Sequence, residues 1–164
     1  MPNLSRSATI AAPAELVFDY VDDIRNLARH MSEARSMPMM GSKLKLEILT
    51  SNATDVGATY RYSGSMMGLV IDFSETVTKY VLGREKTWRT IGTPQLLIVE
   101  RYEMGVVVEP ISESISRLTI SFDYDLPRSG VWRLVGRLLA GSYARWCLDS
   151  MISGTKQDLE RSAP

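Results

Sequence analysis

Two glutamates stand in strand-like stretches where their same-face neighbours are apolar. Glu75 lies two residues from both Phe73 and Val77, and Glu100 is flanked in the same way by apolar residues. Since side chains alternate between the two faces of a strand, both carboxylates are predicted to face the interior. A carboxylate in an apolar pocket has a raised pKa and can act as an acid or a base. Glu75 and Glu100 are therefore the candidate catalytic residues.

Each of these glutamates also has an interpretation without chemistry. A shift of one residue in the register of either strand would turn its carboxylate to the opposite face. Alternatively, each carboxylate pairs with an arginine and serves only the fold. Both alternatives stay open from the sequence, so a catalytic role for Glu75 and Glu100 is a hypothesis.

Aromatic and apolar side chains on the same predicted faces could line a ligand pocket beside the two glutamates. Rings that carry a polar group suit a flat hydrophobic ligand with a few oxygen atoms. For any single ring, packing in the core explains its position as well, but the set as a whole favours a pocket. The predicted ligand-binding residues are Tyr60, Tyr62, Phe73, Glu75, Trp88, Glu100, Tyr102, Tyr124, Leu139 and Trp146.

Alternation of apolar and polar residues predicts strands along most of the chain. Short turns separate them, one of them at residues 92–94, and this is typical of an antiparallel meander. Two short helices are predicted between the first two strands, from Pro13 and over residues 27–34, followed by a loop at residues 36–41 with its methionines turned inward. The strands are predicted near residues 4–11, 44–48, 59–64, 69–78, 85–91, 95–109 and 118–126.

A long helix at residues 131–160 is predicted to cover the apolar face of the sheet. It follows a break at Pro127 and carries apolar residues at helical spacing, among them Val131, Leu139 and Trp146. No other predicted element is large enough to cover a sheet. The fold class is therefore α+β, in a single domain over residues 1–164: an antiparallel sheet of six to seven strands wrapped around a long C-terminal helix.

Composition excludes several classes of function. Nineteen basic and nineteen acidic residues cancel, so a nucleic-acid partner is not expected. Cys147 is the only cysteine and His30 the only histidine, and no nucleotide-binding motif is present, so neither a metal site nor a cofactor is predicted. The chain has no apolar run long enough for a membrane span and no signal-peptide pattern at residues 1–6. A cytoplasmic protein is expected.

Three parts of the chain resemble a known group of proteins. They are residues 10–18 (IAAPAELVF) with 20–23 (YVDD), residues 77–84 (VTKYVLGR) with Thr87 and Trp88, and residues 116–119 (SRLT) leading into 122–124 (FDY). In this order and spacing they resemble the START-like superfamily. That group includes polyketide cyclase/dehydrase proteins, lipid-transport proteins and plant pathogenesis-related allergens.

The resemblance implies a helix-grip fold, in which the sheet bends around the last helix and leaves a deep cavity between them. Members bind sterols, lipids, polyketides, quinones or plant hormones, and some are cyclases or aromatases. The superfamily shares no universal catalytic motif, so no catalytic residue carries over. Many members have a tryptophan near the end of the second short helix, where this chain has His30 and Met31.

Alternative functions follow from the resemblance. One is binding or transport of a small hydrophobic ligand that is lipid-, polyketide-, quinone- or sterol-like. Another is a polyketide cyclase, aromatase or dehydratase type of enzyme that uses cavity Glu and Tyr residues without a metal or nucleotide cofactor. A third, delivery or sensing of a lipid for another component as a homodimer, also stays open. In each case the partner is a small hydrophobic molecule, and stable membrane insertion is not expected.

Overall fold

The computed structural model describes residues 3–32, 43–66, 68–96 and 98–161, so the loop predicted at residues 36–41 lies outside the described residues. Within them the chain has the predicted α+β order of strands and helices. The elements are β1 (Asn3–Ile10), α1 (Ala14–Asp22), α2 (Ile24–Ser32), β2 (Lys43–Ile48), β3 (Thr59–Met66), β4 (Leu69–Val81), β5 (Glu85–Gln95), β6 (Arg101–Pro110), β7 (Ser116–Asp125) and α3 (Gly130–Arg161).

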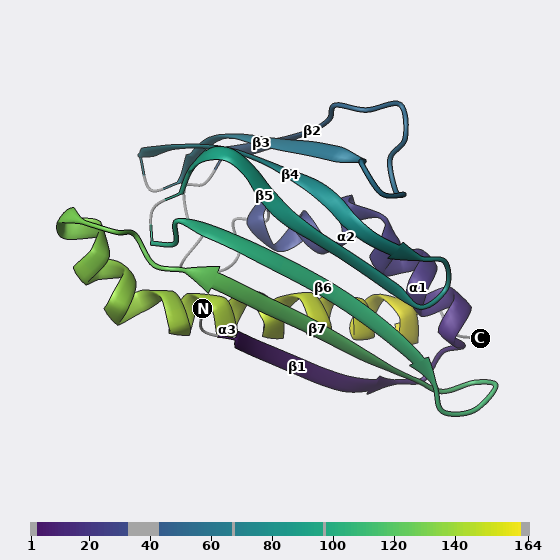
Figure 1. Cartoon of the computed structure of the whole chain (residues 1–164). Coiled ribbons are helices and arrows are strands. Elements are labelled where there is room, and N and C mark those ends of the chain that lie inside the picture. The colour runs from purple at the N-terminus through teal and green to yellow at the C-terminus, as the bar shows by residue number, and fades with distance from the viewer. Residues whose placement is uncertain (1–2, 33–42, 67, 97, 162–164) are drawn as a thin grey trace.

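The seven strands form one antiparallel sheet in the order β1-β7-β6-β5-β4-β3-β2. The sheet bends around α3, which runs along its concave side (Figure 1). In β7, Leu118, Ile120 and Phe122 are buried while the residues between them are partly exposed. This period of two is the pattern of a strand with one face on the core. The predicted fold class is confirmed.

The connection between β5 and β6 comes later in the chain than predicted. A turn was predicted at residues 92–94 and a strand over residues 95–109, but β5 continues through the glycine and proline of this segment and β6 begins only at Arg101. Residues 92–94 stand opposite Phe73 alone, and Gly92 has a φ of 68°. The segment is therefore a β-bulge inside the ladder rather than a turn, and it adds curvature to the sheet.

Small residues, not large apolar ones, bring the first half of α3 onto the sheet. Gly136, Ala140 and Ala144 are buried at a spacing of four residues. A Cβ atom at Gly136 would lie 2.6 Å from the backbone oxygen of Ile98, so the helix approaches too closely for a side chain there. The prediction that Leu139 faces the interior was wrong, since it is 52% exposed.

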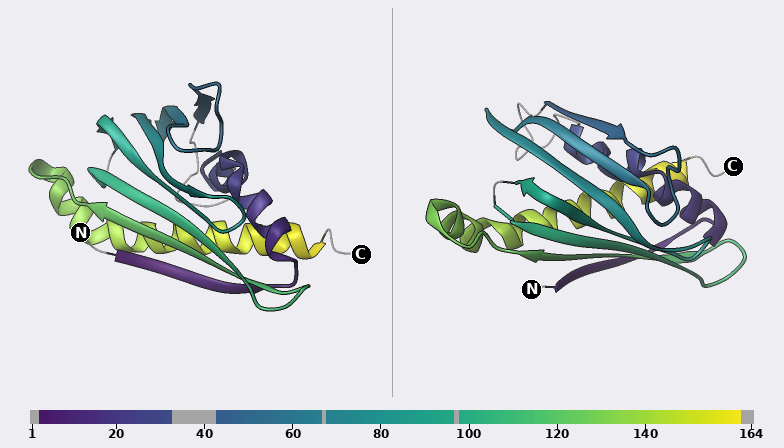
Figure 2. Two further views of the ribbon diagram at one scale, coloured as in Figure 1. Left: turned by 45° about the vertical axis from the view of Figure 1, so that its right-hand side comes forward. Right: turned by 45° about the horizontal axis from the view of Figure 1, so that its top comes forward.

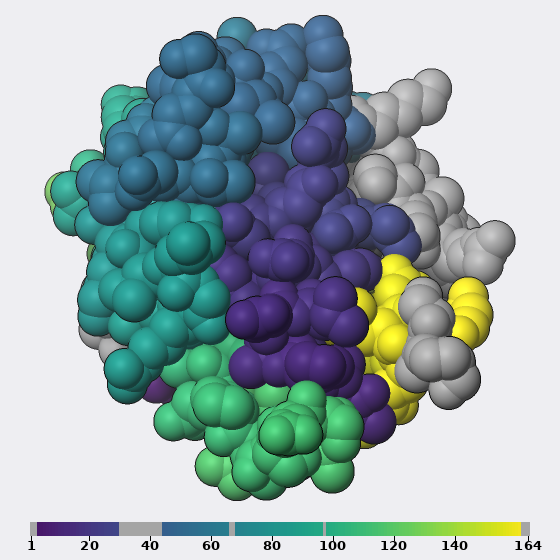
Figure 3. Space-filling view, turned by 90° about the vertical axis from the view of Figure 1, so that its right-hand side faces the viewer, coloured from purple at the N-terminus to yellow at the C-terminus, as the bar shows by residue number. Residues whose placement is uncertain are grey.

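The first turns of α3 extend past the ends of the strands (Figures 1 and 2). Their large apolar side chains have no sheet to cover, which is why the hydrophobic pattern did not identify the buried face. At the other end of the molecule, α1 lies between the connections of the sheet (Figure 3). Val17, Phe18 and Val21 of α1 are buried there, so α1 packs into that end of the core.

Candidate ligand-binding site

A cavity lies between the inner face of the sheet and the helices α2 and α3. Its volume is about 60 Å³, counted over the positions that the centre of a water-sized sphere can take. One water needs about 10–15 Å³ by this measure, so the cavity has room for a few waters or one small ligand. Its lining comprises Ile24, Leu27, Ala28, Leu44, Tyr62, Phe73, Glu75, Trp88, Leu96, Val99, Tyr102, Met104, Phe122, Tyr143, Cys147 and Met151.

Among the described residues of this lining, Glu75 is the only carboxylate, and β4 places it there between two buried apolar residues. Its side chain is 2% exposed. The Tyr102 hydroxyl, from β6, donates a hydrogen bond to Oε1 of Glu75. Within the described part of the chain, Oε2 has no hydrogen-bond partner. One carboxylate oxygen is thus satisfied, and the other is buried at an apolar cavity without a partner.

Burial shifts the acid–base behaviour of Glu75. It raises the pKa of the carboxyl from 4.5 to about 7, against the lowering effects of the hydrogen bond from Tyr102, the charge of Lys86 and a hydrogen bond from Trp88. Burial also raises the pKa of Tyr102 well above 10, and the neighbouring carboxylate adds to this. At neutral pH the carboxyl of Glu75 exchanges readily between its acid and its base form, while the phenol stays protonated.

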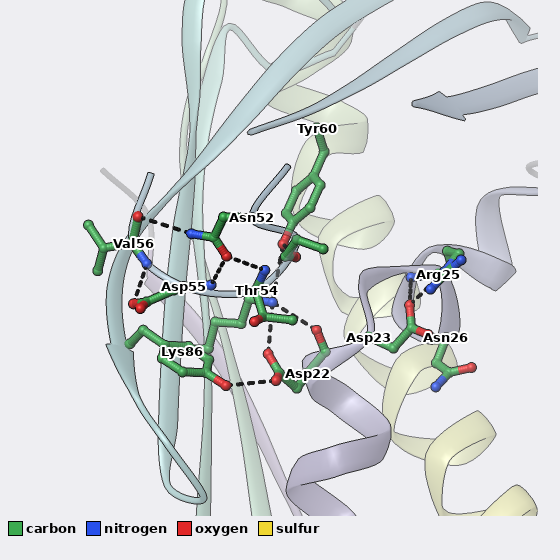
Figure 4. A network of polar contacts seen from close by, with 12 residues as sticks. Asp22, Asp23, Arg25, Asn26, Asn52, Thr54, Asp55, Val56, Tyr60 and Lys86 are labelled. Carbon is green, nitrogen blue, oxygen red and sulfur yellow. Dashed lines mark hydrogen bonds and ion pairs between the residues drawn. The ribbon is translucent and has the colours of Figure 1, made fainter. Parts of the chain in front are cut away.

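A second buried polar cluster fixes α1 to the sheet (Figure 4). The side chain of Lys86, on β5, is 1% exposed and ends in an ammonium group. It donates to the backbone oxygen of Asp22 at 2.8 Å, to Oδ1 of Asp22 at 2.9 Å and to the Tyr60 hydroxyl at 3.3 Å. Tyr80 donates to the other Asp22 oxygen at 2.8 Å. All three ammonium hydrogens have acceptors, so this cluster is a structural clamp.

The described residues offer little for a metal or a membrane. Among them, no three His, Cys, Asp or Glu side chains lie close enough together to hold a metal ion. None of the helices described, α3 included, is both long enough and apolar enough to cross a bilayer.

A curved sheet, a long C-terminal helix and a cavity between them characterise a known family. Residues 1–160 match the family described as polyketide cyclase / dehydrase and lipid transport. The chain belongs to this family. The resemblance seen in the sequence is thereby confirmed over nearly the whole chain.

Solved structures share the fold of this polyketide cyclase-family chain. The aromatase/cyclase Zhui from Streptomyces sp. R1128 is 16% identical with a TM-score of 0.74, over 98% of this chain and 94% of that chain. Norcoclaurine synthase from Thalictrum flavum is 17% identical with a TM-score of 0.65, over 99% and 89%. A START superfamily protein from Mycobacterium smegmatis is 17% identical with a TM-score of 0.64, over 96% and 98%.

At these identities the likeness shows the fold alone. None of the curated proteins compared with the chain is similar enough in sequence to count as a match. A function therefore has to be inferred from the family and from the geometry of the cavity.

Half of the predicted site residues meet at the cavity of this family member. They come from four neighbouring strands, β3 to β6, and their side chains all point to the concave side of the sheet. The predicted inward faces of β3, β4 and β5 were right, as was that of β6 from Tyr102 onward, so the alternation of side chains placed these residues correctly. They are Tyr62, Phe73, Glu75, Trp88 and Tyr102.

Glu100 does not face the interior, contrary to the prediction. It precedes β6, where its backbone N–H donates to the oxygen of Asp125 at 2.7 Å. Its Oε1 lies 3.2 Å from Nε of Arg128, and its side chain is 27% exposed. The predicted strand began at residue 95, but β6 begins only at Arg101. The alternation of side chains therefore does not apply to Glu100, which was wrongly assigned to the interior face. The alternative of an arginine pair applies to Glu100 and not to Glu75.

The remaining predicted residues lie outside the cavity lining. Tyr60 belongs to the Lys86 cluster, and Leu139 is exposed. Tyr124 is buried and stands opposite Tyr102 in the β6–β7 pair, but the cavity lining includes its neighbour Phe122, whose ring centroid is 5.5 Å from that of Tyr124, and not Tyr124 itself. Trp146 packs on Tyr143, with centroids 5.8 Å apart, and it is Tyr143 that lines the cavity.

Sequence reasoning missed the wall contributed by the helices. Ile24, Leu27 and Ala28 of α2 line the cavity, as do Cys147 and Met151 of α3. For α2 the spacing of three and four residues is a signal that could have been used. For α3 the same spacing could not be used, because exposed leucines in its first turns hide which face of the helix is buried.

Proposed function

We propose that the protein binds a small hydrophobic molecule in this cavity, with a polar group of the ligand at Glu75. The observation that carries the proposal is the unpartnered Oε2 of Glu75. Buried polar atoms almost always have a hydrogen-bond partner, and leaving one without costs about 1–3 kcal/mol. A ligand that supplies the missing partner recovers this free energy, while the apolar lining contributes the hydrophobic part of its affinity.

The family and the size of the cavity limit which ligands the proposal can include. The family description includes polyketide cyclases and lipid transport, and Zhui is by name an aromatase/cyclase. A cavity of about 60 Å³ suits a ligand of about one ring, whereas a lipid or a polycyclic polyketide requires the lining to rearrange. Transport of the ligand, a cytoplasmic location and a homodimer remain predictions from the sequence.

A second candidate function, enzymatic acid–base catalysis of the cyclase type, is favoured by one observation. The carboxyl of Glu75 has a pKa of about 7 and accepts a hydrogen bond from the Tyr102 hydroxyl. Such a group can take a proton from one atom of a substrate and return it to another. Turnover of a polyketide-like substrate that is lost with Glu75→Gln would favour this candidate. Exchange of ligand without chemical change would favour binding alone.

The binding proposal predicts that phenol enters the cavity more readily than toluene, because its hydroxyl can donate to Glu75. Met104 and Met151 line the cavity, so their ¹³C-labelled methyl groups report entry in NMR titrations. Ala28→Leu fills part of the cavity and is expected to weaken phenol binding about tenfold or more. Ala53→Leu is the matched control, since Ala53 is exposed in the connection between β2 and β3.

Two outcomes would count against the proposal. One is a titration in which phenol shifts other resonances of the protein to a plateau but leaves the methyl resonances of Met104 and Met151 unshifted. The other is a phenol affinity that Ala28→Leu and Ala53→Leu change equally.

A further inference from the structure

The neighbours of Glu75 oppose the effect of burial on its carboxyl, which raises the pKa to about 7. The Tyr102 hydroxyl donates to Oε1, and the indole of Trp88, which also lines the cavity, acts in the same direction and lowers the pKa of the carboxyl. Both neighbours are donors, and donors favour the ionised carboxylate over the neutral acid. When the carboxyl is ionised, Oε2 presents to the cavity a hydrogen-bond acceptor that carries negative charge.

This carboxylate lacks a counter-ion of its own. Lys86 is near enough for its charge to lower the pKa of Glu75, but its ammonium hydrogens go to Asp22 and Tyr60. Within the described residues, Glu75 takes part in no ion pair. Among the described residues, the other titratable groups in or beside the cavity have pKa values raised by burial and are neutral at pH 7: Tyr60, Tyr62, Tyr102, Tyr143 and Cys147.

The rest of the lining suits a positive charge. Aromatic rings attract a cation that lies within about 6 Å of the ring centroid, and the attraction is stronger where water is excluded. The Tyr102 ring, next to Glu75, has centroids of Phe73 and Phe122 at 6.0 and 5.2 Å. The rings that line the cavity are Tyr62, Phe73, Trp88, Tyr102, Phe122 and Tyr143.

We propose that the ligand of this cavity is a small apolar amine, bound as its ammonium ion with an N–H donated to Oε2 of Glu75. The inference rests on the proposed function and names the ligand class. A hydroxyl would satisfy Oε2 but leave the buried carboxylate without a counter-charge. An ammonium group supplies the hydrogen bond and the charge together, and charge-assisted hydrogen bonds are about twice as strong as neutral ones.

The test compares three probes of similar shape: 2-phenylethylamine, 2-phenylethanol and ethylbenzene. The amine is expected to bind at least about tenfold more tightly than the alcohol at pH 8. Alkylammonium groups titrate near pH 10, so the amine stays charged while Glu75 ionises. Its affinity is therefore expected to rise about tenfold or more between pH 5.5 and pH 8.5, while the affinity of the alcohol changes little.

Glu75→Gln keeps an acceptor for Tyr102 but removes the negative charge, so it is expected to abolish the preference for the amine. Glu100→Gln is the control, because Glu100 lies outside the cavity and pairs with Arg128. Thermal unfolding of both variants checks that each is folded. Equal or tighter binding of the alcohol, or an amine preference that survives Glu75→Gln, would overturn the inference and leave the proposed function intact. Failure of all three probes to enter the cavity would overturn both.

Discussion

Between pH 4 and pH 8, the free energy of unfolding of the wild-type protein is expected to fall by about 3 kcal/mol relative to that of Glu75→Gln. The cause is the pKa of Glu75, which burial raises from 4.5 to about 7 in the folded protein. Between these two values the folded protein binds more protons than the unfolded chain, so its free energy of unfolding falls with rising pH. A tenfold difference in proton affinity between the folded and unfolded states corresponds to about 1.4 kcal/mol.

Chemical denaturation at a series of pH values measures this difference directly. Other carboxylates titrate in both proteins and cancel in the comparison. Glu100→Gln removes one exposed ion pair. The difference between its free energy of unfolding and that of the wild type is expected to vary by no more than about 0.5 kcal/mol over the same pH range. A Glu75→Gln difference that is equally flat would mean that Glu75 ionises as it does in water.

Asp22→Ala is expected to destabilise the protein by about 3–5 kcal/mol, the largest effect of any single substitution considered. It leaves the ammonium of Lys86, which is 1% exposed, without its carboxylate. It also removes the acceptor of the Tyr80 hydroxyl. Breaking a buried ion pair from one side costs this much because the remaining charge stays desolvated. Urea denaturation at pH 7 measures the loss.

Asp23→Ala provides a matched control one residue away. The Asp23 carboxylate accepts from the backbone and side chain of the exposed Arg25, each at 3.0 Å, so its loss is expected to cost about 1 kcal/mol. The double variant of Asp22→Ala with Lys86→Met should recover part of the stability, because it removes the stranded charge. Equal effects of Asp22→Ala and Asp23→Ala would contradict the clamp.

The fold was predictable because its strongest signals are local. Alternation through β4 and β7 predicted both strands and their buried faces, and Pro13 marked the start of α1. The error at β5 and β6 has a local cause as well. Gly92 and Pro94 usually signal a turn, and here they form a bulge that only the pairing with β4 reveals.

The site was predictable only where strands form it. Glu75 and Tyr102 were identified from alternation, but the hydrogen bond between them depends on how β4 and β6 are positioned across β5, which no local pattern encodes. The α3 wall was missed because Gly136 and Ala140 bring the helix onto the sheet by being small. A search for large apolar residues selects Leu139 instead, which is exposed.

The most direct measurement is the ¹³C chemical shift of the Glu75 side-chain carboxyl as a function of pH, with and without 2-phenylethylamine. It tests the central claim, that a buried carboxyl with one unpartnered oxygen recognises the ligand. The expected midpoint is near 7 for the protein alone, and the bound amine should move it to lower pH. A midpoint near the ordinary 4.5 in both samples would place this carboxyl in water and contradict the claim.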